Sequence, residues 1–164
     1  MQRFLGTTGI ALAMIIYTII ITIILTFIIV PLCNNTKAYL LAHQFKKVTL
    51  PIEIQLLETK GAIERNNGSG EYVHCVGVGL IKTQLSIDEI RKVFELHNYG
   101  DVYCYKGIPE IYIYNTEQRE QEKSIYYTPP EFKTLKKGNN DKDYYYYVEI
   151  RSKSFNNLFD LRAW

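Results

Sequence analysis

The sequence predicts an α+β protein with one N-terminal transmembrane helix, followed by a small, mainly antiparallel sheet that one main helix covers. Three observations predict it: an uncharged apolar run near the N-terminus, several alternating stretches rich in tyrosine and isoleucine, and one strongly amphipathic helical stretch. The boundaries that follow are a tail at 1–9, a transmembrane helix at 10–32, a juxtamembrane stalk at 33–47 and a soluble α+β domain at 48–164.

The apolar run from Ile10 to Leu32 holds about 23 uncharged residues, which is enough helix to cross the hydrocarbon core of a bilayer. A cleavable signal has a core of only about 7–15 residues and then a small-residue cleavage site, but this run ends in Val30-Pro31-Leu32. A lipoprotein signal places a small residue before the cysteine, whereas the bulky Leu32 precedes Cys33. We therefore expect a permanent signal-anchor, and acylation of Cys33 by other enzymes stays open.

The side on which the domain lies is less directly encoded. Three lysines follow the run, Lys37, Lys46 and Lys47, and by the positive-inside rule they favour a cytoplasmic domain over the single Arg3 on the other flank. A very short tail before a long apolar run is nevertheless the usual form of a signal-anchor. We therefore expect a single-pass protein of the cell membrane with an extracytoplasmic domain.

The domain opens with a predicted hairpin. A strand is expected over 54–63, a turn over "RNNGSGEY", and a second strand over "YVHCVGVGLIKT". On the second strand Val73, Cys75, Gly77, Gly79 and Ile81 share one face, which is unusually small. Because glycine weakens a strand unless something lies close against it, we expect a helix on this face.

The best-defined soluble helix begins at Ser86, which forms a capping box with Glu89. Its apolar side carries Ile87, Ile90, Val93, Phe94 and His97, and Gly100 ends it. We expect this helix to lie against Gly77 and Gly79. Four further strands are expected in "DVYCYKG", "PEIYIYN", "KSIYYT" and "DYYYYVEIRS", with loops at Pro129-Pro130 and "KKGNNDKD" and a short terminal helix from Ser154.

The order of Leu50-Pro51, "NNGSG", "TQLSIDEI" and the terminal "DLRAW" resembles a family of short, membrane-anchored, uncharacterised proteins of Gram-positive bacteria. The shared pattern is a Leu-Pro start, a Gly/Asn turn, a T-x-L-S-x-x-E helix start and a terminal Asp-x-Arg, and this chain departs from it at Ala163, where glycine is expected. The resemblance implies an extracytoplasmic α+β domain on a single anchor and supplies no catalytic residue.

Cysteine chemistry leaves two alternatives. Cys75 and Cys104 lie on predicted strands on either side of the helix, so they form a disulfide if those strands are neighbours, and are otherwise two buried thiols. A metal site is not expected, because His74 and Cys75 are adjacent on a strand and point to opposite faces. No catalytic constellation is present in the sequence, so we expect a protein that is not an enzyme and uses no cofactor.

The tyrosines provide the candidate binding surface. Tyr112 and Tyr114 on one strand, and Tyr145 and Tyr147 on another, form an aromatic binding face if they line up exposed; otherwise they are cross-strand packing. A net charge of +2 argues against a nucleic-acid partner. The leading expectation is a binding or regulatory module that contacts an envelope protein, a peptide or the cell wall. The alternative is a membrane-tethered inhibitor or immunity-like partner of a toxin or enzyme, and an enzyme is the third and least favoured class.

Overall fold

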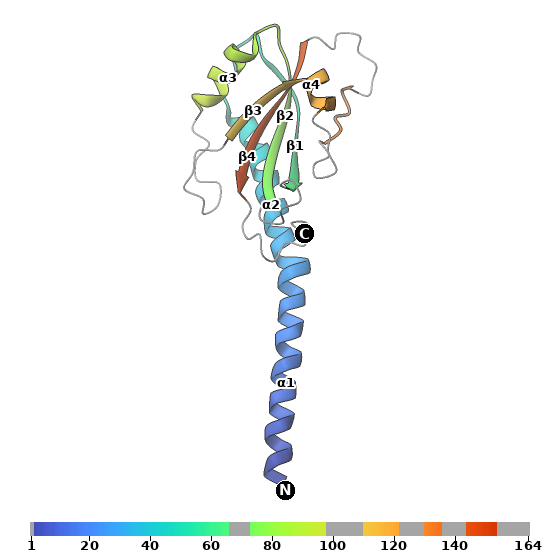
Figure 1. Ribbon diagram of the computed structural model, residues 1–164. Helices are drawn as coiled ribbons and strands as arrows, with labels where there is room; N and C mark the ends of the chain where they lie inside the picture. The colour runs from blue at the N-terminus through green and yellow to red at the C-terminus, as the bar shows by residue number, and fades with distance from the viewer. Residues whose placement is uncertain (1, 66–72, 98–109, 122–129, 136–143, 154–164) are drawn as a thin grey trace.

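The computed structural model describes residues 2–65, 73–97, 110–121, 130–135 and 144–153. It confirms the predicted fold class: a long N-terminal helix leads into a four-stranded antiparallel sheet with helices packed on it (Figure 1). The helical part comprises α1 (Gln2–Ile24), a π-helical turn (Leu25–Ile29), α2 (Val30–Gln44), a 3₁₀ turn (Phe45–Lys47), α3 (Ile87–Glu95) and α4 (Thr116–Gln121). The strands are β1 (Gln55–Arg65), β2 (Val73–Lys82), β3 (Glu110–Asn115) and β4 (Tyr145–Lys153).

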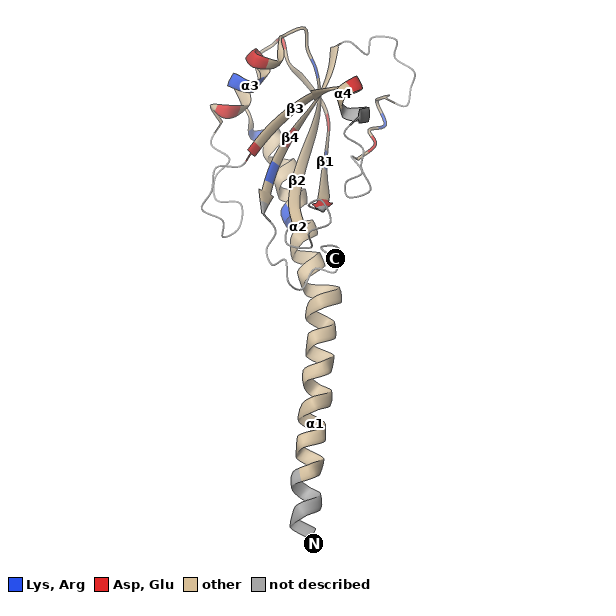
Figure 2. Ribbon diagram, in the orientation of Figure 1, with Lys and Arg blue, Asp and Glu red and all other residues tan. Residues whose placement is uncertain are grey.

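One continuous helical rod, Thr8–Lys47, is long and apolar enough to cross a membrane. Residues 8–29 of this helix carry no charged side chain and project away from the sheet (Figure 2). The hydroxyls of Thr18, Thr22 and Thr26 donate to carbonyls one turn earlier, at 2.8–2.9 Å, so these polar groups are satisfied within the helix. The π-helical turn ends two residues before Pro31, whose ring would crowd the carbonyl four residues earlier, at Phe27 within that turn. The wider turn lets the helix continue past the proline.

The sheet has the strand order β1-β2-β4-β3, with every neighbouring pair antiparallel. The hairpin partners Gly61 and Gly77 lie opposite each other, and Ile150 follows on β4. Of the later predicted strands, the structure contains β3 and β4. The segments "DVYCYKG" and "KSIYYT", the turn at 66–70 and the terminal helix from Ser154 lie outside the described residues.

Helix α3 has the predicted capping box. The Ser86 hydroxyl accepts from the Glu89 N–H at 3.4 Å, and the Ser86 N–H donates to the Glu89 carboxylate at 2.9 Å. Ile90 and Phe94 are fully buried, and the Phe94 ring meets Phe45 edge-on at 5.7 Å between centroids. Helix α3 therefore closes one end of the same core that α2 closes along its length.

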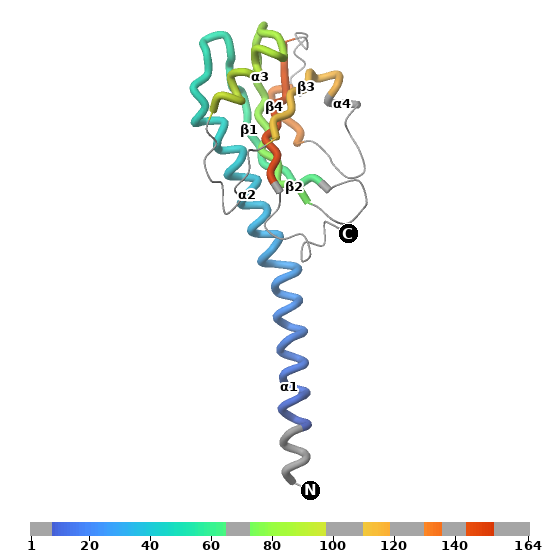
Figure 3. The backbone as a smooth tube through the Cα atoms, turned by 60° about the vertical axis from the view of Figure 1, so that its left-hand side comes forward, coloured from blue at the N-terminus to red at the C-terminus, as the bar shows by residue number. Residues whose placement is uncertain are grey.

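The prediction that the Ser86 helix covers Gly77 and Gly79 is wrong, because α2 lies on Gly77 and Phe45 of the following 3₁₀ turn lies on Gly79. A Cβ on Gly77 would lie 2.5 Å from the Leu41 carbonyl carbon, and one on Gly79 would lie 2.8 Å from the Phe45 ring. In β1, a Cβ on Gly61 would lie 2.6 Å from the Ala38 carbonyl carbon. Gly61 and Gly77 thus let the backbone of α2 lie directly on β1 and β2, and Gly79 leaves room for the Phe45 ring (Figures 1 and 3).

The segment expected to be a stalk is therefore part of the core. The apolar residues Ala38, Leu41, Ala42 and Phe45 are each at most 3% exposed and follow helical spacing. The core on this side joins α2, α3 and the sheet, and includes Ala38, Leu41, Phe45, Cys75, Ile81, Ile90, Phe94, Ile113, Val148 and Ile150. As a result, the helix that leaves the apolar run is also the cover of the sheet.

Candidate functional site

The predicted tyrosines lie on the sheet face opposite α2, here called the outer face. This face carries Val76, Val78 and Leu80 of β2, Tyr145, Tyr147, Glu149 and Arg151 of β4, and Tyr112 and Tyr114 of β3. Tyr114 is directly opposite Tyr147 across the β3–β4 pair. The side chains therefore share a face as predicted, but their exposure differs.

Tyr145 and Tyr147 are not exposed, and this corrects the expectation of a four-tyrosine binding face. Tyr145 is 2% and Tyr147 is 9% exposed. Phe132, from the segment 130–135, covers them, with its ring centroid 5.6 Å from that of Tyr147. The sequence contains one signal of this cover, because Phe132 and Leu135 are apolar residues three apart in the charged stretch "EFKTLKK".

Tyr112 is the tyrosine of this set that remains most accessible, at 36%. Its ring stacks on Tyr114 at 6.3 Å between centroids, and the Arg151 guanidinium carbon lies 4.3 Å from its centroid. The Tyr112 hydroxyl donates to the Glu110 carboxylate at 2.9 Å, and this bond, followed by partial burial, raises the pKa of Tyr112. The ring is thereby packed as a neutral phenol against Tyr114 and Arg151, and about a third of the residue is exposed.

Next to Tyr112, three strands contribute to an ion cluster. The Arg151 Nη2 donates to Glu149 at 2.9 Å, and the Arg151 Nε lies 3.3 Å from Glu64. His74 Nδ1 lies 3.9 Å from the same Glu64 oxygen. Burial alone lowers the pKa of Arg151, but the carboxylates of Glu149 and Glu64 outweigh it and raise the pKa.

The chemistry of this cluster is that of a fixed charge group. Glu149 is fully buried, and a buried carboxylate is stable only when it is paired and hydrogen-bonded, as it is here by Arg151. Because the guanidinium bridges two carboxylates, it orients Tyr112 rather than offering a free cation to a ligand. Within the described ranges, no three His, Cys, Asp or Glu side chains are grouped so that they could hold a metal ion.

Cys75 points to the opposite side of β2 and is fully buried under α2. Its thiol donates to the Asn34 carbonyl at 3.4 Å. Cys104 lies outside the described residues, so the Cys75–Cys104 disulfide stays a prediction.

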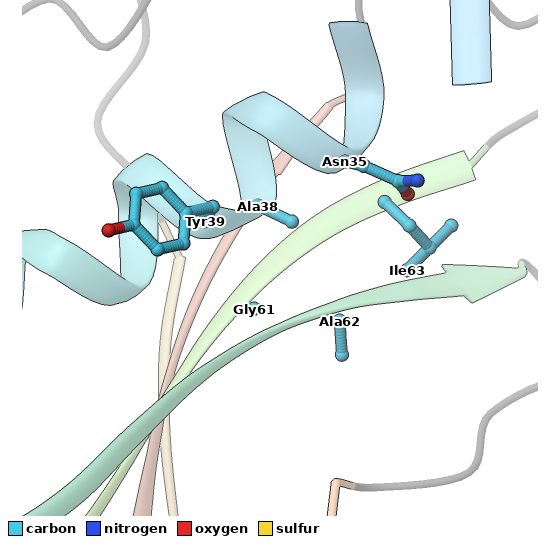
Figure 4. Close-up of a pocket in the computed structure, with 6 residues that line it drawn as sticks. All are labelled: Asn35, Ala38, Tyr39, Gly61, Ala62 and Ile63. Atoms are coloured by element: carbon cyan, nitrogen blue, oxygen red, sulfur yellow. The ribbon is translucent and has the colours of Figure 1, made fainter. Parts of the chain in front are cut away.

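A second surface lies between α2 and β1, where the structure contains an open groove of about 340 Å³. Six residues line it: Asn35, Ala38, Tyr39, Gly61, Ala62 and Ile63 (Figure 4). Ala38 and Gly61, which lie against each other, form its floor, and the Ala62 side chain points away from α2 (Figure 4). The rim carries the exposed Tyr39, which is 64% accessible. Sequence reasoning missed this groove because it treated 33–47 as a spacer.

Comparison with known proteins gives no match: no family model, curated protein or solved structure is similar to the chain at a significant level. The family resemblance based on "NNGSG", "TQLSIDEI" and "DLRAW" therefore stays a prediction, and the function has to be argued from the two surfaces described above.

Proposed function

We propose that the protein is a single-pass, membrane-anchored binding module without catalytic activity, whose domain lies outside the cell. The observation that carries the proposal is that one helix contains the apolar run and also covers the sheet through α2. A domain joined to its anchor in this way keeps one orientation at the membrane surface. Such a mounting suits a protein that presents a surface to a neighbouring molecule.

The surface proposed for binding is the exposed part of Tyr112 with Tyr114 beside it. Its geometry supports this role because a rigid aromatic side chain gives contact area at little cost in conformational entropy. Arg151 and Glu110 already fix Tyr112 before any ligand arrives. The proposed ligands are an envelope protein, a peptide or a wall component.

The sidedness is tested with a membrane-impermeant maleimide. Leu96 is 87% exposed, so Leu96→Cys is placed in a chain whose Cys33 and Cys104 are serine, with Met14→Cys in the apolar run as the control. Intact cells should label Leu96→Cys and not Met14→Cys. Labelling of Leu96→Cys only after permeabilisation places the domain inside the cell, in agreement with the flanking lysines.

Binding is tested by photo-crosslinking in the cells that produce the protein, with a benzophenone amino acid at Tyr112. Leu96, which is exposed on another element, carries the same group as the control. A discrete crosslinked product from position 112 and none from position 96 supports the proposal. Equal, diffuse products from both positions argue against a binding surface at Tyr112.

A further inference from the structure

We propose that the outer edge of β1, together with the groove beside it, binds an extended peptide segment of a partner protein as an additional strand. This inference rests on the proposed function only in requiring the domain to act at a membrane, and it uses a different surface from Tyr112.

β1 is an outermost strand of the sheet, and none of its described side chains is buried. Among the described residues, the only backbone–backbone ladder that β1 forms is with β2. Edges of this kind are usually protected by bulges or charges. The one bulge lies between Leu56 and Glu58, and the charged Glu58 and Lys60 bond to the segment 130–135, so the stretch of the edge with a regular register and no charged side chain is Gly61–Ile63. A regular edge presents a row of backbone donors and acceptors that another extended chain complements.

The groove provides a place for side chains of the added strand. Gly61 in the middle of β1 is exposed, so no side chain shields its backbone from an approaching chain. Next to it lie Ala38 and Ile63, with Asn35 and Tyr39 at the rim (Figure 4). Since side chains of a strand alternate between faces, every second residue of the added strand would point toward this groove. Its small, apolar floor favours an apolar side chain there.

The direction of β1 argues against a second copy of this chain as the occupant. Successive residues of β2 contact successive turns of the helix: Cys75 contacts Asn34, Gly77 lies on Leu41 and Gly79 lies on Phe45. β2 therefore runs in the same direction as α2, away from the apolar run. β1 is antiparallel to β2 and therefore runs back toward it. Antiparallel pairing of two β1 edges would turn the second domain over and point its apolar helix away from the shared membrane.

The position of the groove identifies the kind of partner. Asn35 and Tyr39 are three and seven residues beyond Leu32, which places them roughly 5 and 10 Å above the end of the apolar run. The part of an added strand that lies beside Gly61 and Ile63 is therefore within about two helical turns of the membrane surface. The partner that fits is another membrane protein with an extended segment next to its own span.

The test uses the full chain in nanodiscs and a phage library of random ten-residue peptides as the probe. Selected peptides should slow hydrogen exchange at 58–63 in β1, and leave exchange at 111–114 in the other edge strand, β3, unchanged. Asn35→Tyr, which blocks the groove, should weaken their binding at least tenfold. Thr36→Tyr, at an exposed neighbour that does not line the groove, should leave binding within twofold.

Three results overturn the inference: no enriched peptide, protection elsewhere than β1, or unchanged binding to Asn35→Tyr. A second copy of the chain as the occupant would also overturn the inference. It would appear as slowed hydrogen exchange in β1 without peptide, and this slowing would be lost when each nanodisc holds a single chain. Because these experiments do not involve Tyr112, a crosslink from position 112 would preserve the proposed function while this inference fails.

Discussion

Replacing Gly77 with alanine distinguishes a sheet covered by α2 from a sheet that is open. The new Cβ would lie 2.5 Å from the Leu41 carbonyl carbon and 2.6 Å from the Ala42 nitrogen, about 1 Å inside the usual contact distance. Both neighbours are helix backbone, and β2 is held between β1 and β4, so neither side has a flexible group that can move away. Overpacking of this kind costs about 1–3 kcal/mol.

The sign of the effect is informative. If the face were open, glycine to alanine would instead stabilise the protein by about 0.4–1 kcal/mol, because the unfolded chain loses freedom. Cys75 reports the difference, since it is fully buried under α2 and reacts with a maleimide only when the helix separates from the sheet. In a chain with Cys33 and Cys104 changed to serine, in detergent micelles, Gly77→Ala should label about 5- to 140-fold faster.

Two glycines serve as references for this measurement. Gly61→Ala creates a clash of similar depth, at 2.6 Å from Ala38, but β1 is an edge strand and can shift outward, so a smaller acceleration is expected. Gly9→Ala meets nothing within 4 Å and should leave the rate unchanged. Labelling of Gly77→Ala at or below the parent rate would refute the packing of α2 on β2.

Three further predictions follow from the core, an ion contact and a cap. A fragment of residues 48–164 lacks the buried Leu41 and Phe45, and each contributes about 1.5–3 kcal/mol, which together is much of a typical net stability. This fragment should show no cooperative unfolding by circular dichroism, whereas the fragment 30–164 should unfold cooperatively. Burial raises the pKa of Glu58, but hydrogen bonds from the Thr134 hydroxyl, the Thr134 N–H and the Lys133 N–H outweigh burial and lower this pKa. The free energy of unfolding should therefore fall as the pH drops below about 4.5. Glu58→Gln should reduce that fall in urea titrations. Ser86→Ala should cost about 1 kcal/mol by loss of the cap, and an unchanged urea midpoint would contradict this.

The elements that the sequence predicted well are those encoded locally. The apolar run, the capping box at Ser86 and the alternation in β2 and β4 each depend on residues close together in the chain, and each is present in the structure. The small face of β2 was also recognised, since Gly77 and Gly79 are adjacent on one side. That face predicts a close neighbour without specifying which one.

The parts that were missed depend on contacts between distant segments. Ala38, Leu41, Ala42 and Phe45 have helical spacing, but their proximity to the apolar run predicts a stalk. Their partners lie more than twenty residues later in the chain. The burial of Tyr147 likewise depends on Phe132, fifteen residues earlier in the chain, and no local pattern links the two.

The central claim is that the anchor and the domain form one rigid body through α2. It is tested most directly by the distance between two spin labels in nanodiscs, at Tyr17→Cys in the apolar run and Tyr144→Cys beside β4, with Cys33 and Cys104 changed to serine. Both sites are exposed, at 67% and 41%, so the labels should not disturb packing. We predict one narrow distance distribution, which broadens when a flexible Gly-Ser-Gly-Ser insertion follows Leu32. A parent distribution as broad as that of the insertion variant would contradict the account.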